Sequence, residues 1–462
     1  MRYIYLIIGI IAIVIRFIQN FYIEIIPGIN GGYYPVQIRE LLNTGQLGFL
    51  DMPLLFYLNV FFVKISSFFF QNYDVNSIII NTSKTIDCIS LPLLLFPLYL
   101  INKNIFKIKL SYLYEIGIIG FSVLSFSPLY LTSDLQKNTL AIPMLLLILY
   151  YFLYYLKEKT KKTLLIIIAL LIIIGLTHFG VFIVCVCFII IGLVIFFHRK
   201  ALFPILVISL LSIVFVGLFD TSRAVRLIFF LKDSIGHPAF SRVIVHLPSI
   251  FNLISSFILI GLIINIFKTQ RNKLPEFNRK VLILFLCLLL ILSFPLINFE
   301  FSRRLGLMLF IPQSLVLLII YPYLKSKIKF SITVLLILII STSLIYNFSN
   351  LKTASINEEA YNDLKKMKNV IPNPNETIIF VRHGLDWWVA WELKAKIAIS
   401  HYEIVVINEE INNKYKNIMI LIQKKGENKL YPAGKSPFVE PIKPEQCVNI
   451  YNSEYFDMCQ IK

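Results

Sequence analysis

The sequence predicts an α-helical polytopic membrane protein with about eleven transmembrane helices, membrane-parallel helices in an outer loop and a small C-terminal α/β domain. Of 462 residues, 57% are hydrophobic and 15% are charged, and the mean hydropathy of +0.76 excludes a water-soluble globule. Apolar runs near the roughly 20 residues that cross a bilayer recur along the first three quarters of the chain. From about Asn347 the composition becomes that of a soluble domain.

The first apolar run, 3–18, has little basic character before it and no small-residue cleavage site after it. We therefore predict a retained helix, not a signal peptide. Further spans are predicted where apolar runs are bounded by Lys, Arg, Pro or Asn. They cover residues 78–100, 110–131, 140–156, 164–176, 181–197, 202–219, 250–267, 281–297, 305–324 and 331–346.

The net charge of +18 raises the possibility of a nucleic-acid partner. The basic residues, however, fall on alternate connections between the predicted spans, the positive-inside pattern, and so indicate a cytoplasmic N-terminus and no nucleic-acid partner. They are Lys103, Lys107, Lys109, Lys157, Lys159, Lys161, Lys162, Arg199, Lys200, Lys268, Arg271, Lys273, Arg279, Lys280, Lys325, Lys327 and Lys329.

This alternation requires one apolar run not to cross the membrane. The run 54–70 contains Asn59 and Lys64 and has no basic cytoplasmic flank, so we predict an amphipathic helix parallel to the outer surface, like the shorter segment 35–42. The odd number of spans then places the C-terminal domain outside the cytoplasm, in an integral protein of the plasma membrane.

The predicted domains are a transmembrane domain, 1–346, with a first outer loop over 20–77, and an extracytoplasmic domain, 347–462. Periodicity in the second domain predicts strands alternating with helices, and hence some parallel pairing. The helices are predicted over 358–367 and 385–396, and the strands over 377–381, 397–400, 403–407 and 417–423.

The six cysteines divide between the predicted domains. Cys88, Cys185, Cys187 and Cys287 lie in apolar spans, where thiols usually serve as small packing residues. Cys447 and Cys459 both lie in the outer domain. They either form a disulfide in an oxidising compartment or remain free, and both alternatives stay open.

Ionisable residues at the membrane boundary carry the functional prediction, because such groups are costly near the bilayer and are usually kept for pairing or function. Asp134 and Lys137 fall in a tight turn, whereas His178, at a hairpin tip, is either a helix cap or a ligand. For the three arginines between 219 and 249, solvation in a loop is the alternative. The polar residues predicted at the outer face are Glu24, Arg39, Glu40, Asp51, Asp134, Lys137, His178, Arg223, Arg226, Arg242, Glu300, Arg303 and Arg304.

The first outer loop resembles that of the GT-C superfamily of membrane glycosyltransferases, in its protein mannosyltransferase and aminoarabinose transferase branch. Asn30, Tyr34 and Arg39 occupy the places of that branch's Asp, Tyr and Arg, and Asp51-Met52-Pro53-Leu54 that of its Lys-Pro-Pro-Leu. The tract from Ser127-Pro128 through Asp134 to Lys137 resembles its second outer loop. The resemblance covers about the N-terminal half of the chain, and its motifs are short.

The chain departs from this branch at the acidic residue of the first outer loop. Asn30 stands where the branch has an Asp implicated in activating the acceptor, and an amide cannot accept that proton. Three explanations stay open: Asp51 or Glu40 has taken over the role, the acceptor needs little deprotonation, or the chain no longer transfers sugars. We favour the first, because Asp51 precedes an amphipathic helix predicted to face the same cavity.

The resemblance implies a polyprenyl-phosphate sugar donor and an acceptor lipid, glycan or protein, with no cofactor and no metal. A carboxylate would take the acceptor's proton, and cations would stabilise the departing phosphate. The candidate catalytic residues are Asp51, Glu40 and Asp134. The candidate substrate-binding residues are Asn30, Tyr34, Arg39, Lys137, His178, Arg303 and Arg304, of which Arg303 and Arg304 are the leading phosphate ligands.

All three tryptophans lie in the segment 383–391, where helical spacing brings Trp387 and Trp391 to one face with Trp388 beside them. Such a face either docks the domain onto its own sheet or the membrane interface, or contacts the acceptor through Trp387 and Trp388.

The leading hypothesis for function is a membrane glycosyltransferase. The alternatives are a transporter or flippase for a lipid-linked substrate and a noncatalytic member of a glycan-assembly complex. A transporter should show paired charges in mid-span or broken helices in two matching halves, whereas these spans are nearly free of charge and no halves correspond.

Overall fold

The computed structural model describes residues 3–198, 202–219, 221, 225, 247–294, 299–400, 409–426, 440–442, 444 and 447–461. Arg223, Arg226, Arg242 and the strand predicted over 403–407 lie outside these residues. The chain forms two compact units. The helical unit comprises Met1–Phe17, Leu50–Leu55 and Asp87–Asn350, and the sheet unit comprises Ile18–Phe49, Phe56–Ile86 and Leu351–Lys462.

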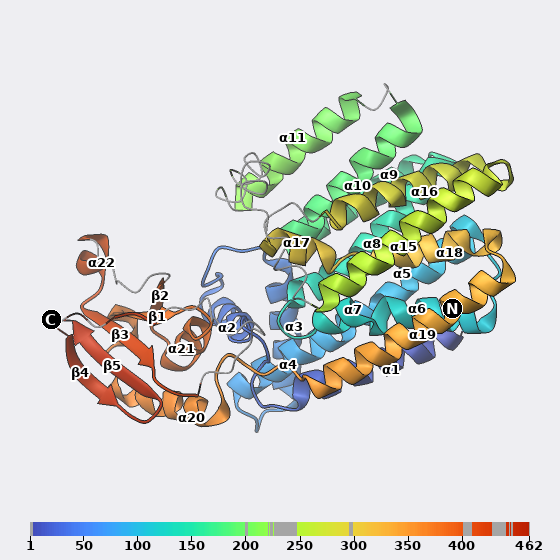
Figure 1. Cartoon of the computed structure of the whole chain (residues 1–462). Helices are drawn as coiled ribbons and strands as arrows, with labels where there is room; N and C mark the ends of the chain where they lie inside the picture. Colours follow the sequence, from blue (N-terminus) through green and yellow to red (C-terminus); the bar gives the residue numbers. More distant parts are fainter. Residues whose placement is uncertain are drawn as a thin grey trace. The chain divides into compact units, whose positions relative to one another are not determined.

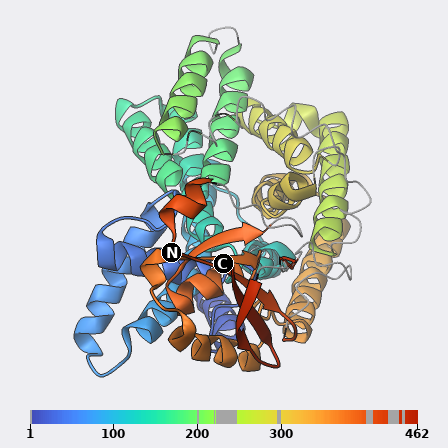
Figure 2. The same ribbon diagram turned by 90° about the vertical axis from the view of Figure 1, so that its left-hand side faces the viewer.

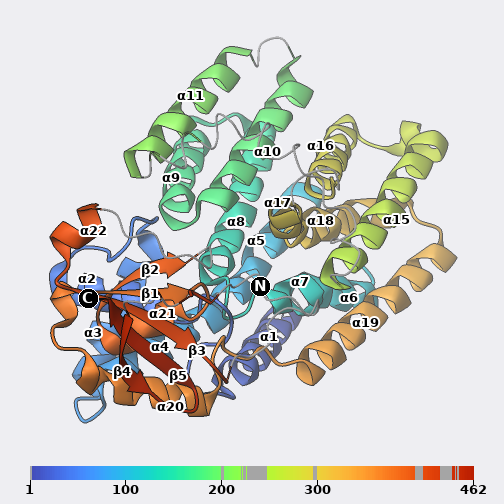
Figure 3. The ribbon, with the colours of Figure 1, turned by 60° about the vertical axis from the view of Figure 1, so that its left-hand side comes forward.

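The helical unit is built from long apolar helices. In Figure 3, α10 lies beside both α9 and α11. The helices that lie wholly or partly in this unit are α1 (Tyr3–Phe21), α3 (Leu54–Phe69), α4 (Val75–Ser90), α5 (Leu95–Leu100), α6 (Tyr112–Leu124), α7 (Phe126–Tyr130), α8 (Gln136–Glu158), α9 (Lys161–Thr177), α10 (Phe179–Phe197), α11 (Leu202–Phe219), α15 (Leu247–Gln270), α16 (Glu276–Leu292), α17 (Phe299–Gly306), α18 (Phe310–Ile320) and α19 (Ser326–Ser349).

Within the described residues, nine helical segments are long and apolar enough to cross a membrane. Each coincides with one of the eleven predicted spans. The two remaining predictions, 164–176 and 281–297, fall on α9 and α16, which have 17 residues each. A 17-residue helix is about 26 Å long, just short of the hydrocarbon core.

Helix α8 forms much of the core of the helical unit, because most of its side chains are buried. It packs against α9 and α10. At Gly192 of α10, an added Cβ would come within 2.4 Å of the Phe152 ring of α8, so glycine permits this close approach. The cysteines predicted as packing residues agree with this apolar setting: Cys88 and Cys185 are buried, and Cys187 and Cys287 are half-buried.

The sheet unit contains a five-stranded mixed sheet with the order β2-β1-β3-β5-β4. Strands β2 (Lys396–Ser400), β1 (Thr377–Arg382) and β3 (Asn417–Gln423) are parallel, which confirms the predicted parallel pairing. Every residue of β1 is buried, as expected of a strand covered on both faces. Helices α20 (Glu358–Lys366) and α21 (Asp386–Leu393) pack together, and α21 contacts β2 (Figure 1).

The sequence analysis missed three elements of this unit. Helix α22 spans Glu409–Lys414, and strands β4 (Cys447–Asn452) and β5 (Phe456–Ile461) form an antiparallel hairpin joined to β3. Figure 2 shows β4 and β5 in dark red as neighbouring arrows. β4 is half-buried to exposed along its length, its sequence lacks clean alternation of polar and apolar residues, and its register is irregular between Asn449 and Tyr451.

The two helices predicted for the first outer loop are present. They are α2, over Tyr33–Thr44, and α3, over Leu54–Phe69. With 16 residues, α3 is too short for the membrane-span criterion that the nine segments meet. Its orientation parallel to the membrane stays a prediction.

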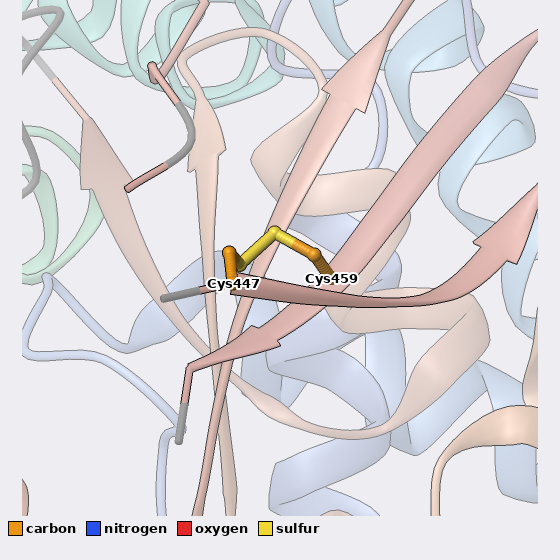
Figure 4. Close-up of a disulfide and its surroundings, with 2 residues drawn as sticks. All are labelled: Cys447 and Cys459. Atoms are coloured by element: carbon orange, nitrogen blue, oxygen red, sulfur yellow. A yellow bond between two sulfur atoms is a disulfide. The ribbon is translucent and has the colours of Figure 1, made fainter. Parts of the chain in front are cut away.

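Cys447 and Cys459 form a disulfide between β4 and β5 (Figure 4). The two residues are separated by 12 positions, and their Cα atoms lie 5.5 Å apart. Of the two alternatives that the sequence left open, the structure contains the bonded one.

We expect the double variant Cys447→Ala/Cys459→Ala to lower the unfolding free energy of the sheet unit by about 3 kcal/mol, the chain-entropy value for a loop of this length. Tryptophan fluorescence during denaturant unfolding measures this unit specifically, because all three tryptophans belong to it. Cys287→Ala, a free cysteine of the helical unit, is the control. An unchanged midpoint in the double variant contradicts the expectation.

Candidate functional site

The turn between α7 and α8 organises the polar residues of the helical unit. Ser133 adopts a left-handed backbone, with φ of 69°, and its N–H donates to Oδ2 of Asp87 over 2.7 Å. The Thr139 hydroxyl donates to the other carboxylate oxygen, also over 2.7 Å. Asp87 thereby fixes the loop that leads into α8.

Arg16 completes this arrangement from α1. Its guanidinium lies 3.3 Å from Oδ1 of Asp87 and donates to the Pro128 carbonyl over 2.9 Å. Both side chains are fully buried. This pair was not predicted, because the spans are nearly free of charge, although an Arg and an Asp inside apolar runs are a visible signal in the sequence.

Asp51 and Lys137, both predicted site residues, form an ion pair. Lys137 lies in the first turn of α8, and the Asp51 side chain is 2% exposed and also accepts the Met52 N–H over 2.8 Å. The Lys137 side chain is 16% exposed. The predicted base thus faces the ammonium of Lys137, which is more exposed than the carboxylate.

The other predicted residues of the helical unit lie on different elements. Asp134 is half-buried in the turn that precedes Lys137. His178 caps α10, because its Nδ1 accepts the Val181 N–H over 3.1 Å, so the capping alternative describes its observed contact. Arg303 is half-buried and Arg304 exposed in the last turn of α17.

A buried amide network joins the second-outer-loop tract to α15, α17 and α18. The Asn252 amide donates to Ser127 Oγ over 2.7 Å and to the Gly306 carbonyl over 2.8 Å. The Gln313 amide donates to the Asn252 carbonyl over 3.0 Å. This network holds Ser127 at the end of the helix that carries both candidate arginines, and the sequence analysis did not identify it.

In the sheet unit, the Asn30-Gly31-Gly32-Tyr33-Tyr34 segment packs against α21. An added Cβ at Gly32 would come within 2.8 Å of the Trp387 backbone, and one at Gly31 within 2.1 Å of the Ile26 carbonyl oxygen. The Tyr33 ring meets the Trp387 ring edge to face at 4.8 Å. This segment, which contains the predicted substrate-binding residues Asn30 and Tyr34, therefore has a packing role, in which the glycines allow close contact with neighbouring backbone.

The tryptophans differ in exposure. Trp388 is fully buried against Tyr361, with ring centroids 5.5 Å apart, and Trp391 is 4% exposed. Only Trp387 is half-buried, against Tyr33 and Phe49. Burial leaves Trp388 no surface for an acceptor, so docking of this face within its own unit is the better description.

Arg39 and Glu40 lie on α2. The Arg39 guanidinium donates to the carbonyls of Trp391, over 2.5 Å, and Ala390, over 2.9 Å. It lies 4.7 Å from the centroid of the Trp391 ring and 3.6 Å from the Glu40 carboxylate. Burial lowers the pKa of Arg39, and Glu40 acts in the opposite direction. These contacts make Arg39 an anchor for the C-terminal end of α21. Tyr34, on the same helix as Arg39, is buried beside Phe56.

We expect Arg39→Lys to lower the unfolding free energy of the sheet unit by about 1.5 to 3 kcal/mol, because an ammonium cannot reproduce two parallel bonds to carbonyls and the stacking. Tryptophan fluorescence during denaturant unfolding measures the effect. Arg271→Lys, at an exposed arginine of the helical unit, serves as the control. Unchanged unfolding combined with lost donor binding would instead assign Arg39 to the substrate.

Comparisons with known proteins give matches among solved structures, but none among protein families or curated proteins. Among solved structures, the chain is similar to ArnT from Cupriavidus metallidurans in the apo state, with a TM-score of 0.44 and 9% sequence identity. The match covers 98% of this chain and 97% of that chain. The match assigns no residue and no activity to this chain.

Proposed function

We propose that the chain is an integral membrane glycosyltransferase that moves a sugar from a polyprenyl-phosphate donor to an extracytoplasmic lipid, glycan or protein. The observation that carries the proposal is the Asp51–Lys137 ion pair at the start of α8. It joins two residues from the two outer-loop tracts that resemble GT-C glycosyltransferases, 86 positions apart in the sequence. Charged residues that serve only to solvate a surface loop are normally exposed, whereas the Asp51 side chain is buried.

In the proposed reaction, an acceptor oxygen attacks the anomeric carbon of the donor as the bond from that carbon to the phosphate oxygen breaks. The Asp51 carboxylate takes the acceptor's proton. Such general-base assistance contributes about 10² to 10⁴ in rate. Lys137 pairs with this carboxylate, and its more exposed ammonium stabilises the charge that develops on the leaving phosphate.

The N-terminus of α8 supports both tasks. The helix dipole favours negative charge at this end. The Asp87 contacts to Ser133 and Thr139 hold the turn in place, which makes Asp87 a positioning residue. Preorganised charges of this kind cost no reorganisation during the reaction.

The remaining predictions belong to the same proposal. Arg303 and Arg304 are further phosphate ligands, and Glu40 and Asp134 are alternative bases. Asn30 and His178 contact the substrate, and Trp387 contacts the acceptor. We also propose a cytoplasmic N-terminus, a domain boundary at 346/347 and an outer C-terminal domain. A reporter fused to the C-terminus tests this topology, and a cytoplasmic signal overturns it.

The experiment for function is incubation of the purified full chain with a panel of radiolabelled polyprenyl-phosphate sugars and a membrane extract as acceptor. We expect one donor to lose its label to the acceptor fraction, with release of polyprenyl phosphate. Absence of turnover with every donor contradicts the proposal and leaves the noncatalytic alternative.

A second candidate function rests on Arg16 and Asp87. Paired charges inside apolar helices were the feature expected of a transporter or flippase, and the structure contains such a pair. The bonds from Ser133 and Thr139 to Asp87 and from Arg16 to the Pro128 carbonyl favour a fixed support over a moving gate. Reconstituted vesicles discriminate the two functions, because a flippase moves a fluorescent lipid-linked sugar across the bilayer with its phosphate bond intact.

A further inference from the structure

A cavity of about 370 Å³ lies in the sheet unit, apart from the residues assigned to sugar transfer in the helical unit. Its walls come from α2, α3, the start of α4 and the residue that follows α21. The polar side chains that line it are Arg39, Asn43, Lys64, Ser67, Asn76 and Lys394. Among the residues that the structure describes, no carboxylate lines it, so the cavity is suited to an anion.

The three cationic side chains of this cavity differ in whether they already have partners within the protein. Arg39 already serves the carbonyls at the end of α21 and the Glu40 carboxylate. Lys64 and Lys394 are exposed, and neither ammonium has a hydrogen bond or ion pair to any residue that the structure describes. Asn43, Ser67 and Asn76 add neutral donors. Two available cations beside three neutral donors match the charge and hydrogen-bonding capacity of a phosphate group.

Helix α3 carries a large apolar surface next to the cavity. Phe61, Phe68 and Phe69 are 57%, 71% and 72% exposed, although Val63, Lys64 and Ser67 of the same helix line the cavity. Exposed aromatic rings beside lysine are the composition of helices that lie in the membrane interface. A water-soluble anion would leave these rings exposed, whereas the acyl chains of a phospholipid would cover them.

We propose that this cavity binds the phosphate of an anionic phospholipid whose acyl chains lie along the exposed aromatic side chains of α3. Lys64 and Lys394 recognise the phosphate, and the aromatic side chains select a lipid over a free anion. The site goes beyond sugar transfer, because a phospholipid is neither the proposed donor nor a product of that reaction.

The test uses the full chain in an uncharged detergent and native mass spectrometry with added phosphatidylglycerol. Each lysine near an anionic lipid surface is worth about fivefold in affinity. We therefore expect Lys64→Gln/Lys394→Gln to weaken phosphatidylglycerol binding about 25-fold. The control is Lys366→Gln/Lys368→Gln, which removes the same charge from exposed positions of the same unit outside the cavity, and it should retain wild-type binding.

Three outcomes overturn the proposal. Phosphatidylcholine with the same acyl chains binding as tightly would mean that the apolar helix alone attracts lipid. Inorganic phosphate competing at equal concentration would assign the cavity to a free anion. Equal losses in the two double variants would mean general attraction to charge. Sugar transfer is measured on the same samples, so failure of the lipid site is distinguishable from failure of the proposed activity.

Discussion

Replacing Asp51 with asparagine is expected to lower the turnover of the polyprenyl-phosphate sugar by about 10² to 10⁴-fold, the usual contribution of a general base. The amide has nearly the shape of the carboxylate and can still meet Lys137, but it cannot take the acceptor's proton. We expect the loss in kcat and not in donor binding, because the proton moves only in the transition state. Scintillation counting of the acceptor fraction under saturating donor measures it.

A structural role for Asp51 is tested by exchanging the charges. Asp51→Lys/Lys137→Asp keeps an ion pair at the start of α8. We expect this variant to fold like the wild type, as judged by size-exclusion chromatography, but to lack turnover. Asp74→Asn is the matched control, because Asp74 is exposed and its carboxylate accepts the Ser77 N–H at the start of α4. Full activity in Asp51→Asn, or its recovery in the exchanged variant, refutes Asp51 as the base.

Replacing Asp87 with alanine is expected to cost the helical unit about 3 to 5 kcal/mol of unfolding free energy. The substitution leaves the buried Arg16 guanidinium without its counter-charge and removes the acceptor for Ser133 and Thr139. Unfolding in mixed micelles with a denaturing detergent measures the loss. A loss below about 1 kcal/mol would show that the pair is not held dry inside the unit.

Removing both charges together separates the cost of an orphaned charge from the value of the pair. Arg16→Met/Asp87→Leu should recover most of the stability, because apolar side chains of similar volume often replace a buried pair without loss. The recovered protein should still transfer sugar slowly if Asp87 positions the turn before α8. Unimpaired transfer would remove that positioning role.

The fold class was accessible from the sequence because bilayer crossing imposes length and composition on each segment separately. Nine predicted spans coincide with helices that satisfy these requirements, and the predicted strands over 377–381, 397–400 and 417–423 are β1, β2 and β3. Each of these signals is local. β4 and β5 escaped prediction because their pairing with β3 depends on tertiary contacts and their own pattern is weak.

Only part of the candidate site could be predicted from the sequence. Asp51 and Lys137 could be named, since polar residues beside apolar spans are conspicuous, but nothing in the sequence indicated that they pair with each other. Arg39 was predicted as a ligand from its residue type, yet its guanidinium holds α21. Side-chain partners far apart in the sequence carry no local pattern.

By itself, the sequence determined that this chain is a helical membrane protein with a small α/β domain, and which polar residues stand near the ends of its spans. Only the tertiary structure decided that Arg16 neutralises Asp87, that Trp388 is buried and that Lys64 and Lys394 line one cavity. The physical reason is range: hydropathy and periodicity act within one segment, whereas ion pairs, burial and cavities form between segments that only folding brings together.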